Sequence, residues 1–437
     1  MNLEEKIYEA GVVGAGGAGF PTHVKAKSKV EYVLANGAEC EPLIHKDFEL
    51  MVNFPQDILA GFNLMLEQTG AKKGYFGIKS KNSSAIEKIE STIGRSNIEM
   101  THLGDFYPSG DEYELVYAAT NRLMPPYGIP LDVGCVVNNV ETLYNVNNAE
   151  KGIPLTEKFI TVTGAVKNPC SFFVPIGTTF REVINFAGCS TIENFGIMVS
   201  GLLMGRLSYD LDEPITKTTA GLILLPMDHY VIMRQGRPIN DMNKIGKSAC
   251  DQCSYCTEFC PRYLLGYDVQ PHKVMRSLAF TKTGESVWNQ YAALCCSCGL
   301  CSLYSCPEDL YPREACDQGK EYLRENKIKY EQQKPVKVHP VKEGRRVPIK
   351  NLMKKLDVAR YEVPTPFTNK KPNPSQVKLM LKQHTGAPSK PVVETGSIVS
   401  KGDLVADVIE GNLGAKIHAS INGKVSEITG EYIIIHQ

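Results

Sequence analysis

Apolar stretches alternate with amphipathic ones through the first part of the chain. Residues 31–35 and 74–78 are short apolar runs with the length and composition of buried strands. Pro55 to Thr69 has the spacing of a helix, and Leu3 to Ala10 has the pattern of a short amphipathic helix. Strands that alternate with helices predict an α/β domain over residues 1–150.

The pattern changes after residue 150. Short β-rich runs broken by glycine and proline, with one helical stretch from Thr179 to Ala187, predict a small β-rich domain over residues 151–245. Lysine and proline are frequent over residues 326–375, which predicts a partly extended connector with a helix from Ile349 to Leu356. Short β-like runs and regularly spaced glycines over residues 376–437 predict a compact all-β module.

Length and composition narrow the class of protein. A chain of 437 residues is too long for one compact core, so several domains are expected. The formal net charge is zero and no polybasic run occurs, which argues against a nucleic-acid or membrane-surface protein. The longest apolar runs, such as Gly221 to Pro226, are too short to span a bilayer. The N-terminus lacks the apolar core of a signal peptide, so we expect a cytoplasmic protein.

Fourteen cysteines in a reducing compartment do not form a disulfide framework. Eight of them form two runs, each with two-residue gaps and a final Cys-Pro. Short gaps turn three thiolates toward one centre, while the cysteine before proline reaches a neighbouring cluster. The runs therefore predict two 4Fe–4S clusters in a ferredoxin-like module over residues 246–325. By resemblance to two-cluster ferredoxins, one cluster takes Cys250, Cys253, Cys256 and Cys306, and the other takes Cys295, Cys298, Cys301 and Cys260.

Zinc is the alternative occupant of the cysteine block. Tetrahedral zinc sites use two separated Cys-x2-Cys pairs, which two consecutive triplets fit poorly. The second run has a four-residue last gap, so its loop is slightly enlarged. Cys296 is out of frame and is expected to be a bystander. The remaining cysteines are expected to be buried small apolar residues; they are Cys40, Cys135, Cys170, Cys189 and Cys316.

A glycine-rich loop near the N-terminus contains a formal G-x-G-x-x-G pattern, at Gly14, Gly16, Gly17 and Gly19. The dinucleotide-binding fingerprint requires a strand before the loop and a helix after it. Here a helical segment precedes the loop and Pro21 follows it, so that context is missing. Backbone N–H groups in such a loop can still hold a phosphate. A plain structural turn is the alternative.

Three further segments carry amides and carboxylates that suit a flavin and a nicotinamide. They are Asn36 to Pro42, Tyr107 to Glu112 and Val136 to Leu143. Together with the glycine loop they resemble the flavin-binding subunit of NADH:quinone oxidoreductase, and more closely the RnfC family of NADH-linked electron-transfer proteins. Residues 151–245 resemble an SLBB β-grasp domain, and residues 376–437 resemble the barrel-sandwich hybrid module of RnfC proteins. That module comes first in RnfC and last here, an order that resembles the PduS family of cobalamin reductases.

The resemblance implies FMN and NADH in addition to the clusters. It implies a flavin-phosphate cradle at the four loop glycines with Asn138, Asn139 and Thr142 nearby, and it puts Asn36 and Glu39 at the flavin ring. It implies a nicotinamide side built from Phe20, Lys25, Glu41 and Glu112. No catalytic acid or base is expected. The C-terminal module lacks a lipoyl- or biotin-attachment hairpin, so a docking or structural role is expected for it.

The resemblance implies an oxidoreductase whose acceptor is cobalamin, on a corrinoid enzyme or an adenosyltransferase, and leaves open its encapsulation in a bacterial microcompartment. Two alternatives remain. One is an RnfC-like subunit that serves another reductase, such as proline reductase, or a membrane Rnf-type complex. The other is a scaffold protein with structural clusters and an empty flavin fold.

Overall fold

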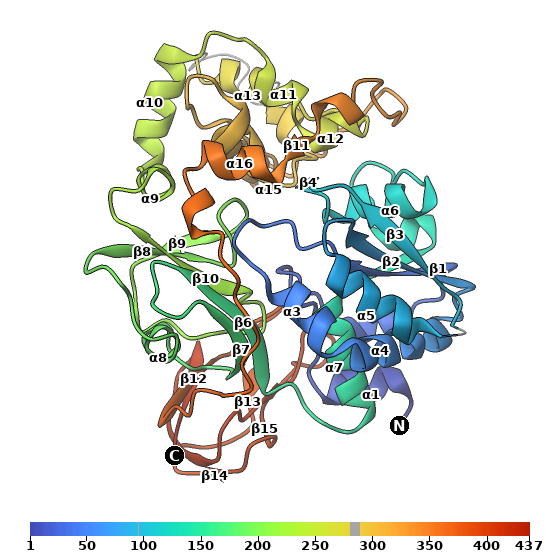
Figure 1. Ribbon diagram of the computed structural model, residues 1–437, viewed down its shortest axis with the longest axis vertical. Coiled ribbons are helices and arrows are strands. Elements are labelled where there is room, and N and C mark those ends of the chain that lie inside the picture. The colour runs from blue at the N-terminus through green and yellow to red at the C-terminus, as the bar shows by residue number, and fades with distance from the viewer. Residues whose placement is uncertain (95, 280–288) are drawn as a thin grey trace.

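The structure is a computed structural model that describes residues 1–94, 96–279 and 289–437 (Figure 1). A parallel sheet of order β3-β2-β1-β5 organises the N-terminal part. Its strands are β1 Tyr32–Gly37, β2 Lys73–Lys79, β3 Ile98–Leu103 and β5 Cys135–Asn139. The helices around it are α1 Leu3–Glu9, α2 Thr22–Lys27, α3 Lys46–Asn53, α4 Pro55–Thr69, α5 Ser83–Ile93, α6 Glu112–Thr120 and α7 Val140–Glu150, with the 3-10 turn η1 Pro130–Val133 before β5. The predicted α/β domain is confirmed, including the strands at 31–35 and 74–78.

Parallel pairing determines where the polar segments of this domain meet. Asn36 of β1 pairs with Asn139 of β5, so both lie at the carboxyl edge of the sheet. This edge is where parallel α/β folds bind ligands. Helix α7 packs closely on α4, because Gly61 of α4 leaves room for the Leu143 carbonyl; a Cβ there would lie 1.9 Å from that oxygen. The sheet and these helices share one apolar core that includes Val33, Phe62 and Phe76.

The second domain is a mixed sheet of order β7-β6-β10-β8-β9. Its elements are β6 Glu157–Gly164, β7 Cys170–Pro175, α8 Phe180–Phe186, β8 Phe195–Val199, β9 Arg206–Ser208 and β10 Gly221–Pro226. Helix α8 was predicted, and it begins with a capping box between Thr179 and Glu182. The prediction of a single helix in this region was wrong, since α9 Tyr230–Gln235 follows β10. Val231 and Ile232 favour strands locally, but the His229 side chain caps α9 and both residues are buried in a helical position.

The cysteine-rich module consists of short helices joined by loops. They are α10 Ile239–Ala249, α11 Tyr255–Glu258, α12 Pro261–Leu264, α13 Pro271–Ser277, η2 Gln290–Ala292, η3 Cys301–Ser305 and α15 Pro312–Glu325. In Figure 1 this module occupies one end of the long axis, in yellow and light orange, above the two sheet domains.

The chain then returns to the first domain before it forms the C-terminal module. After η4 Glu343–Arg345, strand β11 Val347–Pro348 pairs with β4 Phe106–Tyr107, and α16 Ile349–Lys355 and η5 Ala359–Tyr361 follow. Helix α16 matches the predicted helix. Two small sheets complete the chain; they contain β12 Gln376–Met380, β13 Lys390–Pro391, β14 Ile398–Val399, β15 Leu404–Asp407, β16 Ile417–His418, β17 Gly423–Ile428 and β18 Tyr432–His436. Figure 1 shows this all-β module at the end of the long axis opposite the cysteine-rich module.

Candidate functional site

Backbone contacts join the two ends of the glycine loop, and the tip of the loop is exposed. Val13 and Pro21 form a β-bridge, and the Gly14 N–H donates to the Phe20 carbonyl at 2.9 Å. At the tip, Gly16, Gly17 and Ala18 are exposed. A Cβ on Gly16 would lie 3.5 Å from Asn139 Cβ, so the tip faces the end of β5. The loop thus presents backbone and no side chain beyond a methyl group toward the carboxyl edge of the sheet.

Helix α7 begins beside this loop. The Asn139 side chain caps it by accepting from the Glu141 N–H at 3.0 Å, and Thr142 in the first turn accepts from the Ala15 N–H at 2.9 Å. The N-terminus of an α-helix attracts anions through its free N–H groups and its dipole. A phosphate group therefore fits between the open loop and α7.

Asn138 is the most informative residue of this edge. Its side chain is 2% exposed, and neither its amide nitrogen nor its amide oxygen has a hydrogen-bond partner in the described part of the chain. A buried amide without partners is costly and uncommon in native proteins. A bound flavin nucleotide carries donors and acceptors that would satisfy both atoms, so the residues present fit the flavin that the sequence predicts.

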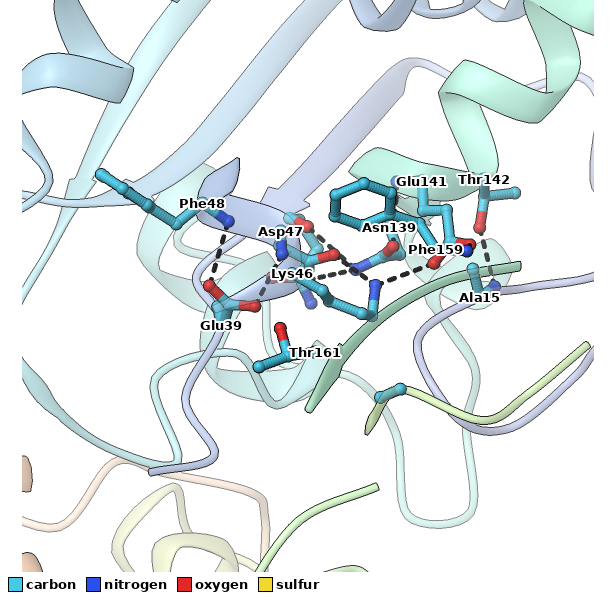
Figure 2. Close-up of polar contacts among 12 residues, drawn as sticks. Ala15, Glu39, Lys46, Asp47, Phe48, Asn139, Glu141, Thr142, Phe159 and Thr161 are labelled. Atoms are coloured by element: carbon cyan, nitrogen blue, oxygen red, sulfur yellow. Dashed lines mark hydrogen bonds and ion pairs between the residues drawn. The ribbon is translucent and has the colours of Figure 1, made fainter. Parts of the chain in front are cut away.

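Figure 2 shows a charged network beside the loop that sequence reasoning missed. Buried Lys46 binds Asp47 and Glu141, at 2.9 Å in the second case, and Lys158 of β6 also binds Glu141. Asn139 donates to Asp47 at 2.7 Å. Lys46 and Asp47 lie a few residues after Pro42 in the sequence, and Glu141 lies inside the segment Val136 to Leu143. The sequence therefore pointed to both regions but could not predict that these side chains pair.

Burial and the charges within this network shift the pKa values of its members in different directions. Burial alone would raise the pKa of Glu141, but Lys158 and Lys46 outweigh it and lower that pKa. Burial lowers the pKa of Lys158 to about 8, against the pull of Glu141. Lys46 has a raised pKa, because Asp47 and Glu141 together exceed the effect of its burial. Glu141 is therefore the fixed negative charge that holds β6 against α7.

Asn36 and Glu39, predicted at the flavin ring, make contacts of different kinds. Asn36 donates to the Gly110 carbonyl at 2.9 Å and accepts from the Ala38 N–H at 3.2 Å. The Glu39 carboxylate accepts from the N–H groups of Asp47 and Phe48, at 2.6 and 3.0 Å, at the start of α3. Burial and then the charge on Asp47 raise the pKa of Glu39 to about 7.

Two of the four residues predicted on the nicotinamide side, Phe20 and Lys25, lie together. The Lys25 ammonium lies 5.9 Å from the centre of the Phe20 ring and donates to the Val137 carbonyl at 2.6 Å. Burial lowers the pKa of Lys25, and the charge on Glu112, at the exposed start of α6, opposes that shift. The carboxylate of the fourth residue, Glu41, is engaged by another domain, since it accepts from the backbone N–H groups of residues 202–204.

The eight run cysteines fall into two spatial sets. We call Cys250, Cys253, Cys256 and Cys306 the outer set, and Cys260, Cys295, Cys298 and Cys301 the inner set. The four outer-set thiols line one cavity. Within the inner set, Cys260 and Cys295 pack in one apolar cluster. Helix α11, which carries Cys256 of the outer set, contacts η3, which begins at Cys301 of the inner set, so the two sets are neighbours.

The arrangement of the outer set suits an inorganic core, because four thiols around a common cavity match the ligands of a cubane cluster. Within residues 1–94, 96–279 and 289–437, no group of three or more His, Cys, Asp or Glu side chains is arranged to hold a single metal ion.

The other cysteines only partly match the expectation of burial. Cys135 and Cys316 are buried. Cys40 and Cys170 are half-buried. Cys189 is exposed, which corrects the prediction; it follows the end of α8 in a left-handed conformation with φ of 70°. Cys296 is half-buried.

Family models match four parts of the chain. The Nuo51 FMN-binding domain matches residues 7–148, the SLBB domain residues 159–191, a 4Fe-4S dicluster domain residues 249–311 and the RnfC barrel sandwich hybrid domain residues 364–437. These matches confirm the predicted fold class in its four parts. None of the described helices is both long and apolar enough to cross a membrane.

Similarity to individual proteins agrees with the family models. A protein of Citrobacter freundii named cobalamin reductase PduS is 37% identical over 439 aligned residues, covering 100% of this chain and 96% of that protein. One subunit of a proton-translocating ferredoxin:NAD(+) oxidoreductase complex from Clostridium ljungdahlii is 36% identical over 264 residues, covering 59% of this chain and 55% of that protein. A crystal structure of an NAD+-reducing NiFe hydrogenase shares the fold at a TM-score of 0.50 and 19% identity, covering 83% of this chain and 67% of the hydrogenase chain.

An FMN-type domain joined to a dicluster module defines a flavin and iron–sulfur oxidoreductase, a protein that transfers electrons. Within that class, the chain belongs to the family of the cobalamin reductases named PduS.

Proposed function

We propose that this protein oxidises NADH and passes the electrons through FMN and two 4Fe–4S clusters to cobalamin. The observation that carries the donor half is the buried, unpartnered amide of Asn138 beside the open glycine loop. The acceptor half is supported by similarity over the full length to relatives named cobalamin reductase.

Each group of residues has a role in this proposal. The loop glycines and the first turn of α7 bind the flavin phosphate, with Asn138, Asn139 and Thr142 nearby, while Asn36 and Glu39 orient the ring. Phe20, Lys25 and Glu112 orient the nicotinamide. Glu41 stays a prediction for that side, although its carboxylate is engaged with residues 202–204. The inner and outer cysteine sets bind one cluster each.

FMN supplies the chemistry that converts two-electron oxidation of NADH to NAD+ into two one-electron transfers. Two electrons reduce two molecules of cob(III)alamin to cob(II)alamin. The protein binds and orients the reactants, and no side chain has to donate or remove a proton at a reacting carbon. The cobalamin is expected on a corrinoid enzyme or an adenosyltransferase.

A second candidate is an electron-transfer subunit that serves a different reductase or a membrane complex. It is favoured by the 36% identity to the Clostridium ljungdahlii subunit of a ferredoxin:NAD(+) oxidoreductase complex. Location separates the two candidates. We propose a cytoplasmic protein, packaged in a microcompartment where the cell makes one, whereas a subunit of a membrane complex would sediment with membranes.

The test is an anaerobic spectroscopic titration of the protein loaded with FMN and clusters. NADH should bleach the flavin and cluster absorption, and cob(III)alamin added next should be reduced at least ~10-fold faster than by an equal amount of NADH-reduced free FMN. If NADH bleaches nothing, the donor half is wrong. If the chromophores bleach but cobalamin reduction does not exceed the free-flavin control, the acceptor is a different molecule.

A further inference from the structure

The two cysteine sets differ in how they contact the FMN-type domain. Tyr107, at the end of β4 in that domain, is 1% exposed, and its hydroxyl donates to the backbone carbonyl of Cys298 at 2.7 Å. This hydrogen bond runs from the first domain directly to the loop that carries the inner set.

A second connection passes through the SLBB domain. The Glu41 carboxylate lies 3.3 Å from the Tyr107 hydroxyl oxygen and accepts from the N–H groups of residues 202–204 at 2.8 to 3.0 Å. Leu203 of that segment in turn contacts the cluster module: Arg313 donates to its carbonyl at 3.0 Å, and a Cβ on Gly299 would lie 3.0 Å from the same oxygen. Gly299 lies between Cys298 and Cys301, so this connection also ends at the inner set.

A third connection is an ion pair. Arg262, two residues after Cys260, binds Asp111 at 2.9 Å, and the two side chains are only 10% and 13% exposed. Asp111 caps α6 and directly precedes Glu112 of the predicted nicotinamide side. Burial of this pair means that its separation would be costly, so it fixes the distance between Cys260 and the FMN-type domain.

The outer set has different surroundings. Its cavity is lined by residues of the cysteine-rich module itself, among them Asp251, Gln252 and His272. Cys253 is exposed to solvent. Figure 1 shows this module at one end of the long axis, with the FMN-type domain below it.

We propose, on the basis of the proposed function, that electrons enter the cysteine-rich module at the inner-set cluster and leave it from the outer-set cluster at the surface around Cys253. Electron transfer slows steeply with distance, so the set tied to the FMN-type domain by three connections receives each electron first. One electron moves at a time: the inner-set cluster is reoxidised as the outer-set cluster is reduced, and the acceptor then takes that electron. The Co(III) centre of the proposed function is the acceptor that is reduced.

Two matched variants test the order, because Cys253 and Cys298 hold the same position in the two runs. Cys253→Ala should leave the inner-set cluster, and Cys298→Ala should leave the outer-set cluster. Rapid-freeze electron paramagnetic resonance after mixing with NADH reports whether the remaining cluster is reduced. We expect reduction at the native rate in Cys253→Ala and at least ~10-fold slower reduction in Cys298→Ala. Dithionite should reduce the remaining cluster in both, and both should retain about half of the native iron.

Tyr107→Phe provides a test that keeps all eight ligands. We expect native iron content and flavin bleaching by NADH at the native rate, with cluster reduction slowed several-fold. Fast reduction in Cys298→Ala with slow reduction in Cys253→Ala would reverse the order. If either single-cluster variant fails to assemble, native-rate cluster reduction in Tyr107→Phe overturns the proposal by itself. Failure of NADH to bleach flavin in the native protein would instead refute the proposed function.

Discussion

At the scale of single residues, a substitution of Asn138 should change FMN affinity and folding stability in different directions. Its buried amide has no partner in the described structure, so Asn138→Ala removes an unsatisfied group and breaks no hydrogen bond. Unsatisfied buried polar groups cost about 1–3 kcal/mol. We therefore expect the FMN-free variant to be at least as stable as the native protein, while its FMN affinity falls ~10-fold or more. Thermal unfolding without FMN and fluorescence titration with FMN measure the two effects.

Asn147 provides the matched control for that prediction. It is similarly buried, on α7 directly after the strand that carries Asn138, but its side chain donates to Asp57 at 2.7 Å. Asn147→Ala should lower stability and leave FMN affinity close to native. If Asn138→Ala instead destabilised the FMN-free protein and bound FMN normally, Asn138 would have a purely structural role.

Residues close in sequence could be predicted as a site, and residues joined across the fold could not. Asn138 and Thr142 belong to one short segment, so the sequence places them together whatever the fold. Lys46 and Glu141 are separated by 95 residues, and their pairing depends on how α3 lies against α7. Glu41 was assigned by resemblance to the nicotinamide side, whereas the structure engages its carboxylate with residues 202–204 of another domain.

At the scale of elements, two glycines of one loop should respond differently to the same change. Gly19 has φ of 64°, and an added Cβ would lie 2.8 Å from Thr218 Cγ2 and 3.1 Å from His384 Cα. Left-handed backbone costs an alanine about 1–2 kcal/mol before any clash. Gly19→Ala should therefore lower the unfolding temperature and loosen the C-terminal module, which limited proteolysis would detect.

Gly16→Ala is the companion change. The backbone of Gly16 is not left-handed, and its nearest atom would be Asn139 Cβ at the ordinary contact distance of 3.5 Å. We expect a native unfolding temperature and a several-fold loss of FMN affinity, since the methyl group enters the proposed phosphate cradle. If the two variants had the same unfolding temperature, the strain expected at Gly19 would be relieved by movement elsewhere in the loop.

Elements with strong local signals could be predicted from the sequence, and those formed by tertiary contacts could not. Helix α4 runs from Pro55 to Thr69 as its pattern predicts, with proline at its start and Gly70 at its end. Helix α9 was missed, because its burial against the SLBB sheet outweighs its strand-forming residues. Strand β11 was also missed, since two residues of a connector become a strand only through pairing with β4.

At the scale of the whole molecule, Lys217 joins three domains. It follows β9 of the SLBB domain, and its ammonium donates to the carbonyls of Gly11 at 2.7 Å and Lys416 at 2.6 Å. Its backbone N–H donates to Gln383 of the C-terminal module at 2.9 Å. Nearby, Thr385 donates to the carbonyls of Ala18 and Gly19. The C-terminal module thus supports the glycine loop through these hydrogen bonds. This structural role is consistent with the one expected from its sequence.

The environment of Lys217 makes this junction sensitive to pH. The side chain is 1% exposed, and burial lowers the pKa of Lys217 from 10.5 to about 7. The neighbouring titratable groups His384, His418 and Lys416 supply no negative charge. Burial, and then the charge on Lys217, lowers the pKa of both histidines, that of His418 to about 4. The ammonium form is therefore disfavoured in the folded protein.

The sign of the effect follows from proton binding. Between pH 7 and about 10.5 the unfolded chain keeps a proton on Lys217 that the folded protein has released, so this group makes stability rise with pH, by at most about 1.4 kcal/mol per unit. Lys217→Met removes that dependence. The stability of the native protein minus that of Lys217→Met should increase from pH 6.5 to pH 9.5, as measured by denaturant unfolding. Lys401→Met, which breaks an exposed pair with Glu157, should give a flat difference over the same range. A flat difference for Lys217→Met as well would mean that Lys217 is charged in the folded protein and that its two carbonyl contacts offset its burial.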